Sequence, residues 1–154
     1  GSRDIPLSEF YTGYRQTVKR EDELLHTVLV PIPSPATKQA FYKVATRQAM
    51  AIAKVSLAAS AEIDSASVIT NPVLAAGSVA AVPVLLPKAQ NFLASGPAVG
   101  VDITETKALA AFATEAGRIA AAEVTPIDDV RSTARYRQMV VGELVRRFVL
   151  QVLS

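Results

Sequence analysis

The chain has 154 residues, half of them hydrophobic, and its 16 Lys and Arg against 14 Asp and Glu leave a formal net charge of +2. This length suits one domain that buries about two thirds of its unfolded surface, and the small, scattered charge argues against nucleic acid as a partner. The absence of cysteine excludes an Fe–S cluster, a thiolate zinc site and a catalytic thiol within the chain, and favours a reducing cytoplasm as its location.

The first 23 residues are expected to form a lead-in segment, and residues 24–154 a single domain. Ser8 is placed to cap a short helical turn that ends at Gly13, because serine accepts backbone hydrogen bonds and glycine tolerates the left-handed conformation. The chain opens without an initiator Met or the apolar core of a signal peptide. We therefore predict no export signal and expect the chain to be part of a larger protein.

Two strands are predicted in the first third of that domain. Residues 24–32 are rich in β-branched side chains and end among prolines, which is typical of a strand followed by a stiff turn. Residues 40–46 alternate between apolar and polar side chains. The short loop between the two segments predicts that they pair antiparallel.

Two further strands are predicted at residues 55–63 and 68–79, after a turn over residues 48–53. Gly77 is expected at a bulge or at a close approach of the backbone. The least polar stretch, residues 72–87, is too short and too often broken by Pro and Gly for a membrane span, so no membrane association is expected.

Three helices are predicted after Pro87, which suits the first position of a short helix that ends at Ser95 and Gly96. Asp102 and Glu105 have the spacing of a capping box. The helix that follows them has an apolar stripe of Leu109, Phe112, Ala116 and Ile119. The final helix, over residues 133–153, has an apolar face of Val141, Leu144, Val145, Phe148 and Val152 opposite Glu143, Arg146 and Arg147.

These elements predict an α+β fold, with an antiparallel sheet of about four strands and three helices packed on one face. The helices leave the opposite face of the sheet uncovered. The N-terminal strands also carry apolar residues on both of their faces, which indicates a missing neighbour.

Side chains that could carry chemistry are few, and no catalytic residue and no metal site are predicted. His26 has no second ligand at a suitable spacing, so a half-exposed strand histidine is the favoured interpretation. Asp128 and Asp129 precede the final helix, where they could cap it and balance Arg131 or Arg135, or act as general acid or base. Lys54 could simply cover apolar surface with its stem.

A basic cluster near the C-terminus has two interpretations. It is either a solvated helix face or a docking surface for an acidic partner subunit. Its members are Arg131, Arg135, Arg137, Arg146 and Arg147.

Four stretches in order resemble the C-terminal domain of the FAD-binding subunit of molybdenum hydroxylases, the group of xanthine dehydrogenases and carbon monoxide dehydrogenases. They are RDIPLSEFYTG at residues 3–13, DELL at 22–25, the run from FYKVATR to AIAKV at 41–55, and TPIDDVRSTARYR at 125–137. Two positions depart from the family pattern. Ala51 stands where many members carry Asp, and residues 83–88 (PVLLPK) replace a common P-x-R-A.

The resemblance implies a part of a multi-subunit oxidoreductase in which electrons pass from a molybdopterin subunit through an Fe–S subunit to FAD, and then to NAD or another acceptor. A preceding N-terminal domain binds FAD in this family, and the C-terminal domain closes over the flavin. The chain lacks the glycine-rich loops of that preceding domain, so alone it is expected to hold FAD poorly and to be inactive.

By position in the family, two short segments are expected to approach the flavin. An apolar wall and a lysine near the ring would shield the reduced flavin and tune its potential, because the protein orients the cofactor and sets its electrostatics. The expected flavin-contacting residues are Ile52, Ala53, Lys54, Leu85, Leu86 and Lys88.

Two other functions remain open from the sequence. A sheet covered by three helices can also serve as a non-catalytic docking or dimerisation module, because fold does not fix function. A small-ligand lyase or transferase is weakened by the lack of paired acid and base groups.

Overall fold

The computed structural model describes residues 1–65, 67–97, 102 and 105–153. The chain forms two compact units, residues 1–34 and residues 35–154. The boundary after Ser34 lies beyond the one expected after residue 23.

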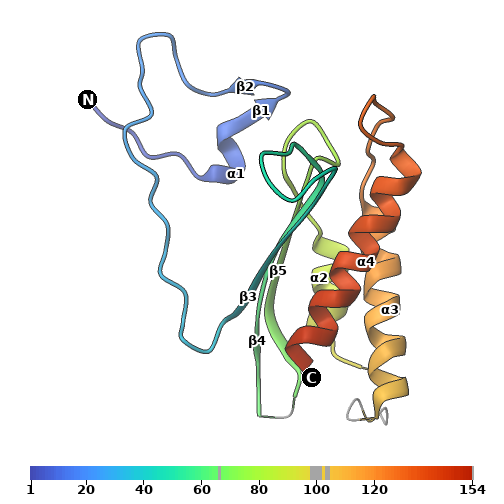
Figure 1. Cartoon of the computed structure of the whole chain (residues 1–154). Helices are drawn as coiled ribbons and strands as arrows, with labels where there is room; N and C mark the ends of the chain where they lie inside the picture. The colour runs from blue at the N-terminus through green and yellow to red at the C-terminus, as the bar shows by residue number, and fades with distance from the viewer. Residues whose placement is uncertain (66, 98–101, 103–104, 154) are drawn as a thin grey trace. The chain divides into compact units, whose positions relative to one another are not determined.

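The second unit is built on a four-stranded antiparallel sheet in the order β3-β4-β5-β6, of which Figure 1 labels the first three strands. Because each strand pairs with the next along the chain, the sheet is a meander. The strands are β3 (Lys38–Ala45), β4 (Ala53–Ile63), β5 (Ile69–Gly77) and β6 (Val84–Leu85).

Three helices lie on one face of this sheet (Figure 1), namely α2 (Pro87–Ala94), α3 (Thr106–Glu123) and α4 (Ala134–Leu153). Alternate residues of β4, from Val55 to Ala61, are buried beneath them. Helix α4 contributes Val141, Val145 and Phe148 to the same core. The predicted α+β sandwich with helices on one face is therefore confirmed.

Helices α3 and α4 pack closely because glycine faces glycine where they cross. A Cβ atom on Gly117 would lie 2.5 Å from the carbonyl oxygen of Gly142, and one on Gly142 would lie 2.8 Å from that of Gly117. No side chain fits at either position without displacing a helix.

The first unit holds a short helix and a small hairpin, α1 (Leu7–Phe10), β1 (Tyr11–Gly13) and β2 (Gln16–Thr17). The short turn predicted near Ser8 is confirmed, but Pro6 occupies the N-cap position and no side chain caps the helix. Arg3 ties the unit together, since its guanidinium donates to both carboxylate oxygens of Glu23 at 2.8 Å.

The strand predicted for residues 24–32 is wrong. The segment has no strand, and its large apolar side chains are exposed. The expected pairing with residues 40–46 is wrong as well, because β3 pairs with β4 alone among the described strands. The fourth strand of the sheet is instead β6, which was not predicted.

The other elements agree closely with prediction. Strands β3, β4 and β5 and helices α2 and α4 fall within a few residues of the expected ranges. Gly77 does lie at a close approach, because a Cβ there would be 2.5 Å from Oγ of Ser56. The predicted capping box is wrong, since α3 begins at Thr106 and Glu105 at its N-cap makes no side-chain capping bond.

Among the described helices, none combines the length and the apolar character that crossing a bilayer would require.

Candidate functional site

A β-bulge at the start of β4 sets the position of Lys54. Val44 pairs with Val55 and Ala45 pairs with Ala53, so Lys54 is the extra residue opposite this step of β3. Bulges turn a side chain away from the alternation of its strand. The Lys54 side chain accordingly extends toward α4, and its Nζ lies 5.4 Å from the ring centroid of Tyr136. This cation–π contact fixes a positive charge at one end of the sheet.

The loop before the bulge is closed by Arg47. Its guanidinium donates to the carbonyl oxygen of Met50, with Nη2 at 2.6 Å and Nε at 3.2 Å. Met50 has a φ of 48°, a left-handed conformation that costs energy for a residue with a side chain. The closed loop presents Met50, which is 92% exposed, and Ile52, which is 66% exposed. The chain thus forms an apolar tip beside Lys54.

A buried arginine joins two other loops at this end of the sheet. Arg137 is 5% exposed, and its guanidinium donates to the Ser78 carbonyl oxygen and to Oδ1 of Asp129, both at 2.6 Å. Ser78 directly follows β5, and Asp129 lies in the loop before α4. Arg137 therefore holds the loop between β5 and β6 against the loop that leads into α4.

The two aspartates before α4 have structural roles. Asp128 accepts a hydrogen bond from the backbone N–H of Ala134, the first residue of the helix. The backbone N–H of Arg131, with help from the Arg137 guanidinium and the N–H of Ser132, lowers the pKa of the Asp129 carboxyl. The capping interpretation is confirmed for Asp128, and Asp129 balances Arg137 and Arg131.

The structure divides the six expected flavin-contacting residues into two groups. Ile52, Ala53 and Lys54 lie at the beginning of β4, while the others lie where β6 joins α2. Leu85 is 55% exposed and faces out of the sheet. Its neighbour Leu86 is fully buried, so its side chain belongs to the core.

Lys88 lies in the first turn of α2, with its side chain exposed. The backbone N–H groups of Lys88 and Ala89 donate to the two carboxylate oxygens of Glu123, at 2.7 and 3.0 Å. Glu123 is the last residue of α3 and so caps the N-terminus of α2 from another helix. A carboxylate is favourable there because the unpaired N–H groups and the helix dipole attract negative charge.

The sheet face opposite the helices is uncovered within the second unit. Phe41, Ala58, Ala75 and Leu85 form one row across its four strands. The two central side chains are small, and the outer two are large and exposed, with Phe41 68% exposed. The row is therefore a shallow trough.

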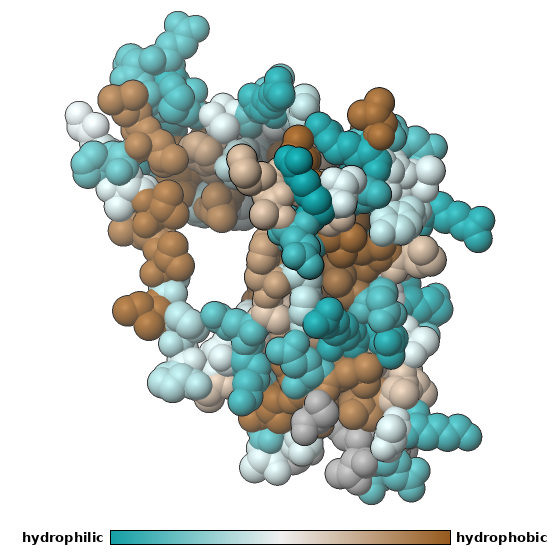
Figure 2. Space-filling model, in the orientation of Figure 1, coloured by the Kyte–Doolittle hydropathy of each residue, from teal (hydrophilic) through white to brown (hydrophobic). Residues whose placement is uncertain are grey.

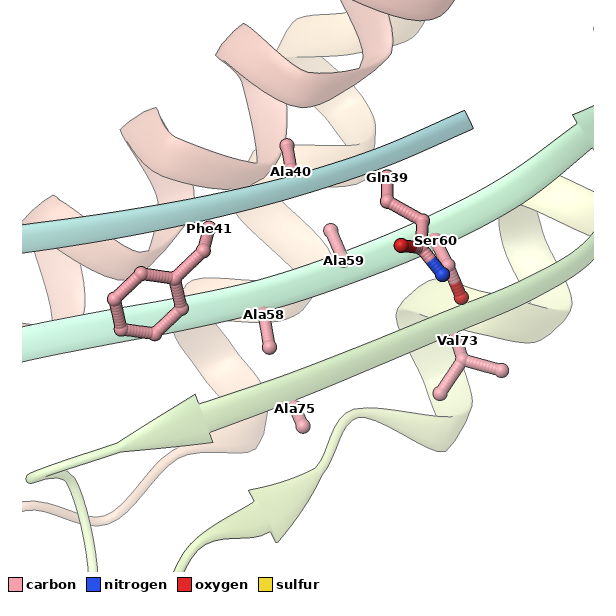
Figure 3. Close-up of a pocket in the computed structure, with 8 residues that line it drawn as sticks. All are labelled: Gln39, Ala40, Phe41, Ala58, Ala59, Ser60, Val73 and Ala75. Atoms are coloured by element: carbon pink, nitrogen blue, oxygen red, sulfur yellow. The ribbon is translucent and has the colours of Figure 1, made fainter. Parts of the chain in front are cut away.

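A hollow of about 420 Å³ lies along this trough. Figure 3 shows Phe41 at one side of it, with Gln39, Ser60 and Val73 at the other and the helices behind the sheet. It has no ionisable side chain in its lining. The hollow therefore offers surface for packing and no acid or base for chemistry.

The remaining candidate residues do not assemble into a reactive group. His26 is exposed in the segment before β3, with Nδ1 2.6 Å from Oγ1 of Thr27. In residues 1–65, 67–97, 102 and 105–153, no three His, Cys, Asp or Glu side chains could together hold a metal ion. The five arginines of the basic cluster do not form one surface. Arg137 is buried, and the guanidinium of Arg147 lies 5.1 Å from the ring centroid of Tyr42.

Sequence reasoning missed three parts of this end of the sheet: the Arg47–Met50 closure, Tyr136 beneath Lys54, and the Arg137 link. The first two depend on a left-handed residue and a bulge, which leave no sequence signal outside glycine and asparagine. Arg137 could have been found, because position 137 falls on the apolar face of α4 with Val141, Leu144 and Phe148.

Residues 40–152 match the family described as the CO dehydrogenase flavoprotein C-terminal domain. The chain is 27% identical over 100 residues to the FAD subunit of nicotinate dehydrogenase from Eubacterium barkeri, a match that spans 63% of this chain and 34% of that protein. The chain thus spans about a third of this curated relative.

Two solved structures share the fold. Carbon monoxide dehydrogenase from Hydrogenophaga pseudoflava aligns at a TM-score of 0.75 and 25% identity, over 94% of this chain and 46% of that one. Quinoline 2-oxidoreductase from Pseudomonas putida 86 aligns at 0.81 and 22% identity, over 98% and 48%. The family match over residues 40–152 covers most of the second unit. The resemblance inferred from the sequence is therefore confirmed. The chain belongs to the family of CO dehydrogenase flavoprotein C-terminal domains.

Proposed function

We propose that the chain closes over the flavin in the FAD subunit of a molybdenum hydroxylase and supports electron transfer from Fe–S clusters through FAD to NAD or another acceptor. The observation that carries this proposal is the family match over residues 40–152. The nicotinate dehydrogenase relative is itself named as an FAD subunit. The partners would be an N-terminal FAD-binding domain, an Fe–S subunit and a molybdopterin subunit of a xanthine dehydrogenase-like enzyme in the cytoplasm.

The residues at the beginning of β4 fit a flavin ring. A ring of this kind needs an apolar surface against its face and a positive charge or donor near its polar edge. Ile52 and Met50 give exposed apolar surface on a loop that Arg47 holds closed. Lys54 gives a charge whose position is fixed by the bulge and Tyr136.

Bound FAD would supply the electron-transfer chemistry, and the chain's own residues would position it and exclude water. In this proposal Ile52 and Ala53 cover the ring, and Lys54 stabilises negative charge on it. Leu85 and Lys88 form a second contact at the junction of β6 and α2, with the buried Leu86 supporting them from the core. The chain alone would hold FAD poorly and be inactive, since its described residues offer surface contacts and no loop among them cradles the diphosphate.

The test replaces Lys54 and Lys88 by alanine, singly, in the full flavoprotein subunit. Loss of either contact should weaken flavin binding or slow flavin reduction, measured by absorbance and stopped-flow kinetics. Lys38→Ala is the matched control, because Lys38 is exposed at the far end of the sheet, where it pairs with Ala61. If both variants bind and reduce flavin as the unaltered subunit does, the assignment of these residues is wrong.

A second candidate, a non-catalytic docking or dimerisation module, is favoured by the uncovered trough around Phe41 and Leu85. Flavin absorbance separates the two functions. A purified full-length subunit that contains no flavin would exclude the first candidate and leave the second.

A further inference from the structure

The segment of residues 24–32 consists mostly of large apolar side chains that are exposed to solvent. Six of its nine side chains are large and hydrophobic and are 63% to 96% exposed: Leu24, Leu25, Val28, Leu29, Val30 and Ile32. Figure 2 shows apolar surface along this extended segment. Such contiguous apolar surface marks a site of interaction.

The backbone of the segment is unpaired as well. In the part of the chain that the structure describes, no backbone hydrogen bond joins residues 24–32 to another segment. An extended run of unpaired N–H and C=O groups is a template for pairing with the edge of a β-sheet. Pro31, Pro33 and Pro35 lack N–H donors, so they end the pairing and stiffen the connection to β3.

We infer that residues 24–32, which form no strand in this chain alone, become one by inserting into a sheet of the preceding half of the flavoprotein subunit. This inference rests on the proposed function, in which such a half exists. The solved relatives are about twice as long as this chain, which spans 46% and 48% of them. The family match starts at residue 40, so the segment lies outside the C-terminal domain family.

The pattern of side chains indicates what kind of sheet receives the strand. In an extended strand, Leu24, Val28 and Val30 lie on one face, and Leu25 and Leu29 lie on the other. Both faces are therefore apolar, which is typical of strands covered on both sides. The receiving sheet must be sandwiched between two layers.

The free edge of β3 does not meet this requirement. The outer face of its sheet is uncovered, as the exposed Phe41 shows. A strand added beside β3 would bury one of its apolar faces and leave the other in water.

A second copy of the segment does not meet it either. Two such strands paired with each other would form an isolated two-stranded ribbon, which is marginally stable and open on both faces.

Hydrogen–deuterium exchange tests the inference without depending on flavin. The amides of residues 25–30 are compared between the chain alone and the flavin-free full-length subunit, with β4 amides as the internal reference for folding. Insertion should slow exchange in the full subunit by at least ~100-fold relative to the chain alone. Equally fast exchange in both proteins, with β4 protected, overturns the inference.

Two other outcomes also overturn it. Protection in the chain alone that is independent of concentration would assign the segment to β3, and protection that grows with concentration would assign it to a second copy. A flavin-free subunit that cannot be loaded with FAD but protects the segment would contradict the proposed function and leave this inference standing.

A pair of variants sharpens the result. Val28→Asp in the full subunit should return the exchange of residues 25–30 to the rate of the chain alone, because a carboxylate is unfavourable between two apolar layers. Val130→Asp is the matched control, since Val130 is fully exposed and lies outside the segment. If Val28→Asp does not fold, the comparison of the two unaltered proteins still decides the question.

Discussion

Residues 35–154 bury a core of apolar side chains, whereas most of the large apolar side chains of residues 1–34 are exposed. In the first group, Leu57 and Phe148 are fully buried between the sheet and the helices, and in the second, Leu24 and Ile32 are more than 90% exposed. The side chains are chemically alike. Composition therefore indicates which residues require burial, while the partner that buries them need not belong to the same segment of chain.

Two substitutions, one in the core and one in the exposed segment, test this contrast directly. Phe148→Ala should lower the free energy of unfolding by about 3–5 kcal/mol, because it removes a fully buried ring and leaves a cavity. Leu29→Ala in the chain alone should change it by less than about 0.5 kcal/mol, because Leu29 is exposed. Urea unfolding followed by circular dichroism measures both, and equal effects would contradict the contrast.

The next effect compares two arginines. Arg137→Met should cost about 2–3 kcal/mol, because it breaks two short hydrogen bonds at a buried guanidinium. Arg3→Met in the first unit should leave the unfolding midpoint of residues 35–154 unchanged, since the Arg3–Glu23 pair is solvent-exposed. Unfolding of the two variants by urea gives the comparison. A larger shift for Arg3→Met would show that the exposed unit supports the core.

A smaller effect concerns helix capping. Glu123→Ala should destabilise the protein by about 1 kcal/mol, because α2 loses the carboxylate that accepts its first N–H groups. Amide exchange in α2 should accelerate first. Glu115→Ala is the control, since Glu115 pairs with Arg118 on the surface of α3. The capping role is wrong if the two variants have the same effect on α2.

A still smaller effect is the dependence of folding stability on pH in the acid range. Hydrogen bonds from Arg3 lower the pKa of Glu23 to about 2 from 4.5, and the N–H of Arg131 lowers that of Asp129. Because both folded-state pKa values are depressed, both groups contribute stability above their unfolded values, and that contribution disappears as pH falls through the folded values.

NMR titration of the side-chain carboxyl groups from pH 6 to 2 is the measurement. The Arg3–Glu23 link should open at the acid end of this range. Arg3→Met should raise the Glu23 pKa without restoring it fully, because the backbone N–H of Arg20 still donates to the Glu23 carboxylate. An unshifted Glu23 in the unaltered chain would contradict the link.

Much of the fold could be predicted from local sequence. Buried and less buried side chains alternate along β4 and β5, as the sequence pattern predicts. Pro87 and Gly96 mark the two ends of α2, and the apolar residues of α4 recur at helical spacing. The failure at residues 24–32 is instructive, because the pattern does favour a strand. A strand forms only with a partner, and periodicity reports the preference of a segment without naming what it pairs with.

The candidate site was less predictable. The expectation for Ile52, Ala53, Lys54, Leu85, Leu86 and Lys88 came from resemblance and stays a prediction. The geometry that holds Lys54 comes from a bulge and from Tyr136, more than 80 positions away. Long-range pairings of this kind arise from tertiary packing, which a single sequence does not display.

The crossing of Gly117 and Gly142 has a mechanical consequence. The backbones of α3 and α4 are in direct contact there, so the two helices cannot slide along each other without a steric clash. Any movement of α4 would carry α3 with it, and through Glu123 at the end of α3 it would reach the first turn of α2. The three helices should therefore move together as one rigid body.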